Sequence, residues 1–144
     1  MEYTRLGSSG LRVSRIALGC MSFGTPREIT PWTFGDEAAE PIFRQALDLG
    51  ITFWDTANIY GRGTSEEIVG RALRKYTKRD DIVLATKLFM PMGEGPGGSG
   101  LSRRAVMEQV DASLRRLDTD YIDLTDDEAT ALEEHYTPRE PTYF

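Results

Sequence analysis

The stretch Phe-Trp-Asp-Thr-Ala-Asn-Ile-Tyr-Gly occupies residues 53–61 and is followed, at residues 84–87, by Leu-Ala-Thr-Lys. Each stretch has the pattern of a short apolar strand and its end, so Asp55, Tyr60 and Lys87 are expected at the ends of two strands. A tyrosine acts as a general acid near neutral pH only when a cation lowers its high intrinsic pKa, and a lysine held by a carboxylate supplies such a cation. These three residue types therefore predict a proton-donating site.

Strand and helix patterns alternate along the rest of the chain. Short apolar segments predict a hairpin and four further strands, at 3–6 with 11–13, and at 15–18, 51–54, 82–86 and 121–124. Apolar residues at helical spacing predict helices over 36–49, 65–76 and from Ser102 to about Leu117. Residues 89–101 contain five glycines and predict a long, mobile loop.

Several residues mark the expected helix ends. Thr64 to Glu67 have the pattern of a capping box, Ser102 is a candidate N-cap, and Gly50 is a candidate stop signal. Pro41 conflicts with the first helix, because an interior proline removes a hydrogen bond and clashes with the preceding turn. Either that helix begins at Glu40 with proline as its first residue, or its first turn is distorted.

The strands start at intervals of roughly 30 to 40 residues, which is the spacing of βα units with parallel strands. An open α/β sheet and part of a (β/α)8 barrel both fit this alternation. Polar or small residues follow the strands at Gly19-Cys20-Met21, Asp55 and Lys87, so they share one rim, where barrel enzymes keep their chemistry. No G-x-G-x-x-G motif follows the first strand, so a Rossmann site is disfavoured.

Composition narrows the classes of function. The 144 residues fit one domain, and a net charge of −6 argues against nucleic acid or an anionic membrane as partner. The basic clusters at 71–75 and 115–116 are expected to be solvated helix faces. No apolar run approaches the ~18 residues of a membrane span and no signal pattern begins the chain, so a cytoplasmic location is expected. The single cysteine, Cys20, excludes an internal disulfide and a cysteine-based metal cluster.

Four segments together resemble one family. They are W-D-T-A-N-I-Y-G, A-T-K, L-S-R-R and S-L-R-R-L-D-T-D-Y-I-D-L, and they resemble the N-terminal half of bacterial aldo/keto reductases, a likeness that covers residues 1–124. The resemblance implies a partial (β/α)8 TIM barrel with a hairpin, about four parallel strands, three helices and a short C-terminal helix. It also implies that the protein reduces an aldehyde or ketone to an alcohol and oxidises the cofactor NADPH to NADP.

The resemblance implies a role for individual residues. Tyr60 would give the proton to the carbonyl oxygen, Lys87 would assist the tyrosine, and Asp55 would pair with Lys87 and help to hold the nicotinamide ribose. The same resemblance implies that Gly19, Cys20 and Met21 line the nicotinamide site and that Phe89 touches substrate. Each residue taken alone is more often structural, and Cys20 is more often a small buried hydrophobe; their joint spacing within matching flanks favours the functional interpretation.

The sequence departs from the family after Leu124. A Gln-Ile-His segment with the catalytic His is expected there, whereas this chain has Thr-Asp-Asp-Glu at 125–128. Residues 125–144 instead resemble the C-terminal helix and tail of the family, with a helix expected at about 126–134. His135 belongs to that tail and is poorly placed for catalysis. The simplest interpretation is an internal deletion that divides the chain into 1–124 and 125–144.

This departure has physical consequences. The resemblance implies that most contacts to the cofactor's phosphates come from segments absent here, so NADPH should bind weakly. An incomplete barrel exposes strand edges and an apolar interior face, which predicts association into a homo-oligomer. Two alternatives to an impaired reductase therefore remain open, namely a non-catalytic module that pairs through its open edge and a non-functional deletion product.

Overall fold

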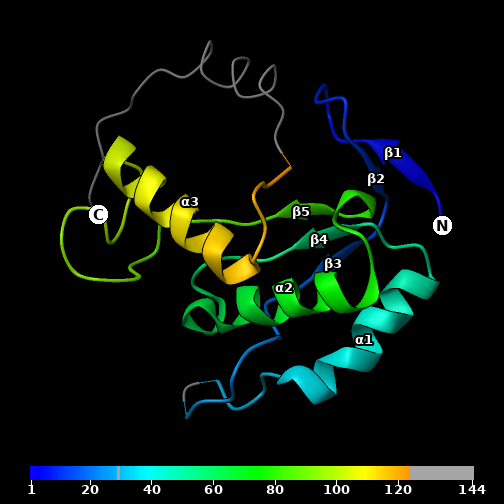
Figure 1. Cartoon of the computed structure of the whole chain (residues 1–144), viewed down its shortest axis with the longest axis horizontal. Coiled ribbons are helices and arrows are strands. Elements are labelled where there is room, and N and C mark those ends of the chain that lie inside the picture. The colour runs from blue at the N-terminus through cyan, green and yellow to red at the C-terminus, as the bar shows by residue number, and fades with distance from the viewer. Residues whose placement is uncertain (29, 124–144) are drawn as a thin grey trace.

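Three short strands form a parallel sheet in the computed structural model, which describes residues 1–28 and 30–123. The strands are β3 (Ala17–Gly19), β4 (Phe53–Asp55) and β5 (Val83–Ala85), and they lie side by side in that order (Figure 1). An antiparallel hairpin of β1 (Tyr3–Arg5) and β2 (Arg12–Ser14) precedes them. The helices are α1 (Asp36–Asp48), α2 (Thr64–Tyr76) and α3 (Arg103–Leu117), with 3-10 turns η1 (Tyr60–Gly63) and η2 (Arg79–Asp81).

The register of the sheet brings the ends of the strands into one row. Gly19 pairs with Asp55, and Asp55 in turn pairs with Ala85. Because the strands are parallel, their carboxyl ends lie at one edge. The predicted alternation of strands and helices and the shared rim are confirmed for these three strands.

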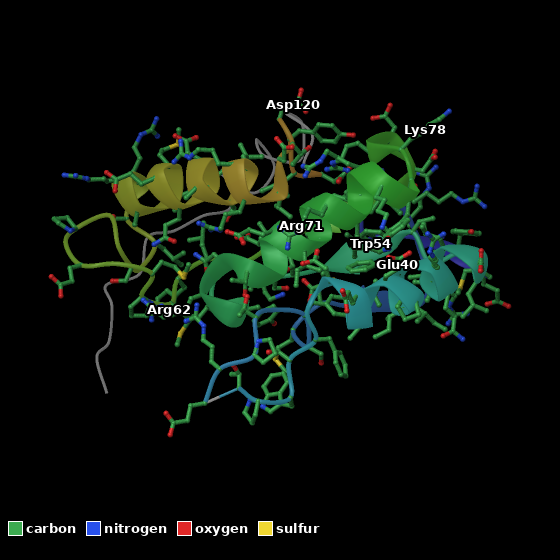
Figure 2. All side chains as sticks on the ribbon, turned by 60° about the horizontal axis from the view of Figure 1, so that its bottom comes forward. Glu40, Trp54, Arg62, Arg71, Lys78 and Asp120 are labelled. Atoms are coloured by element: carbon green, nitrogen blue, oxygen red, sulfur yellow. The ribbon has the colours of Figure 1, made fainter. Side chains whose placement is uncertain are left out.

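Apolar side chains on the helix side of the sheet form the core. Trp54 of β4 is completely buried and its ring centroid lies 4.9 Å from that of Phe43 of α1, which in turn lies 4.6 Å from Phe23. Figure 2 shows Trp54 in the space between α1 and α2. Leu84 of β5 and Val69 of α2 belong to the same cluster. The helices therefore cover one face of the sheet and leave its carboxyl edge to the polar residues.

The hairpin is attached to the opposite end of the sheet. The hydroxyl oxygen of the buried Ser14 accepts hydrogen bonds from the backbone N–H groups of Thr52, at 3.0 Å, and Phe53, at 3.3 Å. The Ser14 hydroxyl donates to the carbonyl oxygen of Ile16, at 2.6 Å. The hairpin is thereby fixed at the amino ends of the strands, away from Asp55.

Two of the predicted helix signals are confirmed. The Ser102 hydroxyl accepts a hydrogen bond from the Ala105 N–H at 3.2 Å, as an N-cap does. Gly50 has a φ of +75° and follows α1 in a Schellman arrangement, in which its N–H bonds to Leu47 and the N–H of Ile51 bonds to Ala46.

The start of α2 differs from the prediction, and the structure decides between the two alternatives for α1. Thr64 is the first residue of α2 rather than its cap, because the N-cap position is taken by Gly63 with a φ of +98°. The Thr64 hydroxyl donates to the Gly61 carbonyl and accepts from the Thr25 N–H, and no side chain caps the start of the helix, so the expected capping box does not form. Pro41 lies inside a continuous α1 that begins at Asp36, as the helical pattern predicted, so of the two alternatives for Pro41 the helix start at Glu40 was wrong.

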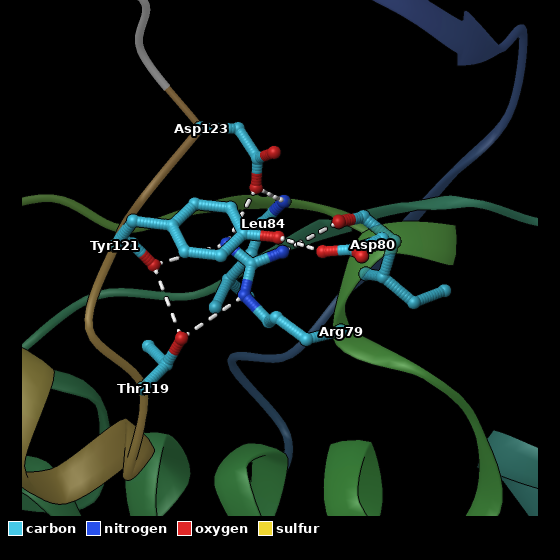
Figure 3. A network of polar contacts seen from close by, with 7 residues as sticks. Arg79, Asp80, Leu84, Thr119, Tyr121 and Asp123 are labelled. Carbon is cyan, nitrogen blue, oxygen red and sulfur yellow. Dashed lines mark hydrogen bonds and ion pairs between the residues drawn. The ribbon is translucent and has the colours of Figure 1, made fainter.

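The strand expected at 121–124 does not form over its described residues, 121–123. Figure 3 shows that the Asp123 carboxylate accepts a hydrogen bond from the Leu84 N–H at 2.7 Å, in the place where a backbone carbonyl of a further strand would accept it. The same carboxylate pairs with Arg79 at 2.7 Å. The Arg79 guanidinium lies 3.9 Å from the Tyr121 ring centroid and donates to the Tyr121 carbonyl. Leu124, His135 and the expected C-terminal helix lie outside the described residues.

The described part of the chain contains no helix that is long and apolar enough to cross a membrane. Strand β3 is an edge strand of the described sheet. Association through such an edge stays a prediction.

Candidate functional site

The predicted trio of Asp55, Tyr60 and Lys87 comes together at the carboxyl edge of the sheet. The Lys87 ammonium donates to the Asp55 carboxylate at 2.6 Å and to the Thr56 carbonyl at 2.6 Å. The same ammonium lies 5.0 Å from the centroid of the Tyr60 ring. Asp55 and Lys87 retain 40% and 46% side-chain exposure, so a small molecule can reach the pair.

Backbone hydrogen bonds continue the pairing of β4 and β5 beyond the strands themselves. The N–H of Thr56 donates to the carbonyl of Ala85 at 2.9 Å, and the N–H of Asn58 donates to the carbonyl of Lys87 at 3.0 Å. The segment that leads from Asp55 to Tyr60 is thus tied along its length to the segment that carries Lys87. This explains how residues 32 positions apart meet at a defined distance.

A sharp turn after Tyr60 directs the chain from β4 into α2. Gly61 and Arg62 have φ values of +57° and +53°, in the left-handed region. A side chain at Gly61 would also collide with Thr64, since an added Cβ would lie 2.3 Å from the Thr64 hydroxyl. The Tyr-Gly pair in the motif therefore has a geometric reason, because only glycine fits both constraints.

A buried ion pair behind Lys87 is missing from the sequence-based prediction. The completely buried Glu66 carboxylate accepts hydrogen bonds from the Thr86 hydroxyl and from Nε of Arg116, each at 2.6 Å. The prediction placed Glu66 in a capping box and Arg116 on a solvated face, which was wrong for both. Helical spacing could have indicated that Arg116 is partly buried. It directly precedes the buried Leu117 and follows the buried Ser113 by three positions, so it lies on the same face of the helix.

The residues expected to hold a cofactor differ in accessibility. Gly19 is exposed, and an added Cβ there would meet no atom within 4 Å, so the space above the end of β3 is free. Met21 is 52% exposed. Phe89, the expected substrate contact, is 57% exposed with a φ of +130°.

Cys20, by contrast, is completely buried. Its N–H donates to the Asp55 carbonyl at 2.8 Å, its carbonyl accepts from the Ser65 hydroxyl at 2.7 Å, and its thiol faces the Leu18 carbonyl at 3.4 Å. Burial, followed by the negative charge of Asp55, raises the pKa of the Cys20 thiol. The side chain therefore packs as a small hydrophobe, and its contact with a cofactor stays a prediction.

We expect Cys20 to resist thiol reagents in the folded protein, because both burial and the raised pKa suppress the thiolate that reacts. Titration with a disulfide reagent at pH 8 should show no fast reaction in buffer and one thiol per chain in denaturant, since the sequence contains one cysteine. A Cys20→Ser variant should show none in either condition. Rapid labelling of the native protein would contradict the burial of this residue.

The arrangement of the trio suits proton transfer. Among residues 1–28 and 30–123, no group of three or more His, Cys, Asp or Glu side chains is placed to hold a metal ion. The trio instead provides a phenol next to an ammonium that is held by a carboxylate. Such a group can give a proton to an oxygen atom bound above the strand ends.

Comparison with known proteins agrees with this arrangement. The model of the aldo/keto reductase family matches residues 15–126. Versiconal hemiacetal acetate reductase of Aspergillus parasiticus is 44% identical, and the match covers 86% of this chain and 41% of that protein. Aldo-keto reductase YhdN of Bacillus subtilis is 45% identical, and the match covers 86% of this chain and 37% of that protein. The holo form of aldo-keto reductase AKR11C1 from Bacillus halodurans superimposes with a TM-score of 0.71 at 41% identity, covering 85% of this chain and 38% of that one.

These neighbours confirm the predicted fold, a partial (β/α)8 barrel. The chain spans about two-fifths of the length of the curated relatives it matches. Because the family model covers most of its residues, this chain belongs to the aldo/keto reductase family.

Proposed function

We propose that this chain carries the proton-donating part of an NADPH-dependent reductase of aldehydes or ketones. The observation that supports the proposal is the joint placement of Asp55, Lys87 and Tyr60, with Lys87 2.6 Å from the carboxylate and 5.0 Å from the phenol ring. Family membership supplies the class of reaction, and the trio supplies the chemistry that this chain can contribute to it.

Each member of the trio has one task in this proposal. The Tyr60 hydroxyl donates its proton to the carbonyl oxygen of the substrate. Lys87 stabilises the negative charge left on the phenol oxygen, and Asp55 holds the ammonium in place through their 2.6 Å contact.

In this proposal the nicotinamide ring lies at the carboxyl edge of the sheet, beside Gly19. When bound, NADPH supplies the hydride that reaches the carbonyl carbon. The free space above Gly19 admits a flat ring close to the backbone, and the exposed Met21 offers apolar contact beside it. The Asp55 carboxylate is accessible enough to accept a hydrogen bond from a ribose hydroxyl.

Affinity for the cofactor is expected to be low. This chain spans about two-fifths of its relatives, and the family resemblance assigns most contacts to the cofactor's phosphates to segments beyond those present. Each charge-assisted hydrogen bond contributes about 1.5–3 kcal/mol, so the loss of several weakens binding by orders of magnitude. The family's catalytic His has no counterpart at 125–128, so a slow rate is also expected.

Titration with NADPH, followed by the fluorescence of Trp32 and Trp54, tests the proposal together with an assay for reduction of a reactive aldehyde. We expect saturable, weak quenching that NADP competes for, and a slow aldehyde-dependent consumption of NADPH. Gly19→Val should weaken binding because it fills the free space above β3, whereas Gly93→Val, also without neighbours within 4 Å, should not. If millimolar NADPH gives no saturation and no turnover, the proposal is contradicted. Micromolar binding would contradict the expected loss of affinity.

A further inference from the structure

The loop that follows Lys87 is held by a pair of buried amide side chains. Asn58 and Gln109 are 1% and 4% exposed, and Nδ2 of Asn58 donates to Oε1 of Gln109 at 2.6 Å. Nε2 of Gln109 donates to the carbonyl of Gly97 at 3.2 Å. A backbone carbonyl can only accept, so this contact fixes the orientation of the Gln109 amide and makes Asn58 the donor in the pair.

Asn58 is also part of the candidate site through its backbone. Its N–H donates to the Lys87 carbonyl at 3.0 Å, and it lies between Asp55 and Tyr60 in the sequence. Gln109 lies on α3, and Gly97 lies in the loop of residues 89–101. One chain of hydrogen bonds thus runs from the Lys87 backbone through Asn58 and Gln109 to the loop.

The loop itself is closed by its own hydrogen bonds. The N–H of Gly100 donates to the carbonyl of Phe89 at 2.8 Å, and the N–H of Met92 donates to the carbonyl of Gly98 at 2.9 Å. Figure 1 shows the loop beside the amino-terminal end of α3. An added Cβ at Gly98 would lie 2.1 Å from the carbonyl oxygen of Gly93, so this close approach of two backbone segments requires glycine.

We propose that Asn58 and Gln109 are positioning residues: their buried amide pair couples the 89–101 loop to the segment that carries Tyr60 and so sets where the phenol stands relative to Lys87. This inference rests on the proposed function, because it assigns the two amides to the same site. Loss of either amide leaves a buried polar partner unpaired, which favours opening of the loop. A displaced loop in turn changes the environment of Tyr60.

Two readouts that do not depend on catalysis test the inference. Glu94 is exposed within the loop, so cleavage after it by a glutamate-specific protease reports loop opening. Tyrosine labelled with carbon-13 at Cζ gives a resonance for Tyr60, assigned by its loss in Tyr60→Phe. In Gln109→Met, cleavage after Glu94 should be about tenfold faster and the Tyr60 resonance should shift. Gln45→Met, the same change at an exposed position of α1, should alter neither.

A second variant displaces the loop without touching either amide. Gly98→Ala should open the loop and move the Tyr60 resonance in the same direction as Gln109→Met, whereas Gly93→Ala should change neither readout, because its added Cβ meets no atom within 4 Å. Faster cleavage without any shift of Tyr60 in both variants would overturn the coupling, as would unchanged cleavage in both. If Gln109→Met does not fold, Gly98→Ala decides alone. A failure of the proposed function would show as missing NADPH turnover and would leave these two readouts unaffected.

Discussion

Tyr60→Phe should lower the rate of NADPH-dependent aldehyde reduction by a factor of about 10²–10⁴, the usual contribution of a general acid. The change removes the phenol oxygen and keeps the ring 5.0 Å from the Lys87 ammonium, so the fold and the ion pair with Asp55 should persist. Thermal unfolding followed by circular dichroism should therefore be close to that of the parent. The kinetic effect should fall on kcat, since the lost proton transfer occurs after the substrate binds.

Two control variants separate this effect from unrelated losses. Tyr3→Phe removes a hydroxyl that donates to the Gly50 carbonyl at the amino end of the sheet, so turnover should not change. His135→Ala should also leave turnover unchanged, because the sequence places this residue in the tail. Equal losses in Tyr60→Phe and His135→Ala would show that the tail histidine takes part in the reaction.

Arg116→Met should lower the free energy of unfolding by about 3–5 kcal/mol, the cost of leaving one member of a buried ion pair uncompensated. The Glu66 carboxylate is completely buried, and Arg116 keeps only 20% of its side-chain exposure. Methionine retains the apolar stem of arginine but cannot donate to Glu66. Urea denaturation followed by tryptophan fluorescence measures the change.

The same helix provides a matched control for this prediction. Arg104 of α3 pairs with Glu108 four positions along, but both side chains are more than half exposed. Arg104→Met should therefore change stability by less than about 1 kcal/mol. A loss of similar size in both arginine variants would show that the buried pair is no more important than the surface pair.

The buried pair of Glu66 and Arg116 also connects the helices to the candidate site. The Glu66 carboxylate accepts the hydroxyl of Thr86, the residue before Lys87, so it links the end of β5 to α2 and α3. Close packing of the two helices reinforces this link, because an added Cβ at Gly70 would lie 2.3 Å from the Leu117 carbonyl oxygen. Changes at the helix interface can therefore reach Lys87 through Thr86 without a substitution in the trio itself.

Local patterns in the sequence were sufficient for the order of the strands and helices from the hairpin to α3, and they placed Asp55 and Lys87 at one edge of the sheet. Apolar periodicity and cap residues such as Ser102 and Gly50 act within a few neighbouring positions, so they can be read from the sequence alone. Asp55 ends β4 and Lys87 follows the end of the adjacent parallel strand β5 by two positions, and strand ends in such a sheet share one edge. Their 2.6 Å contact follows from that register.

Contacts between distant segments were beyond the reach of those patterns. Local spacing does not show that Glu66 of α2 meets Arg116 of α3, or that Asn58 meets Gln109, 51 positions away. The same limit produced the wrong strand at 121–123, where the side chain of Asp123 rather than its backbone carbonyl accepts the Leu84 N–H.

The sequence by itself determined the family, the strand-and-helix alternation and the positions of Asp55, Tyr60 and Lys87 at the strand ends, because these depend on residue type and short-range spacing. The tertiary structure alone decided which charged and polar residues are buried and which of them meet. Burial makes an unpaired charge or amide costly, so each of these groups requires a partner. Those partners, Thr86 and Arg116 for Glu66 and Gln109 for Asn58, come from other elements of the fold.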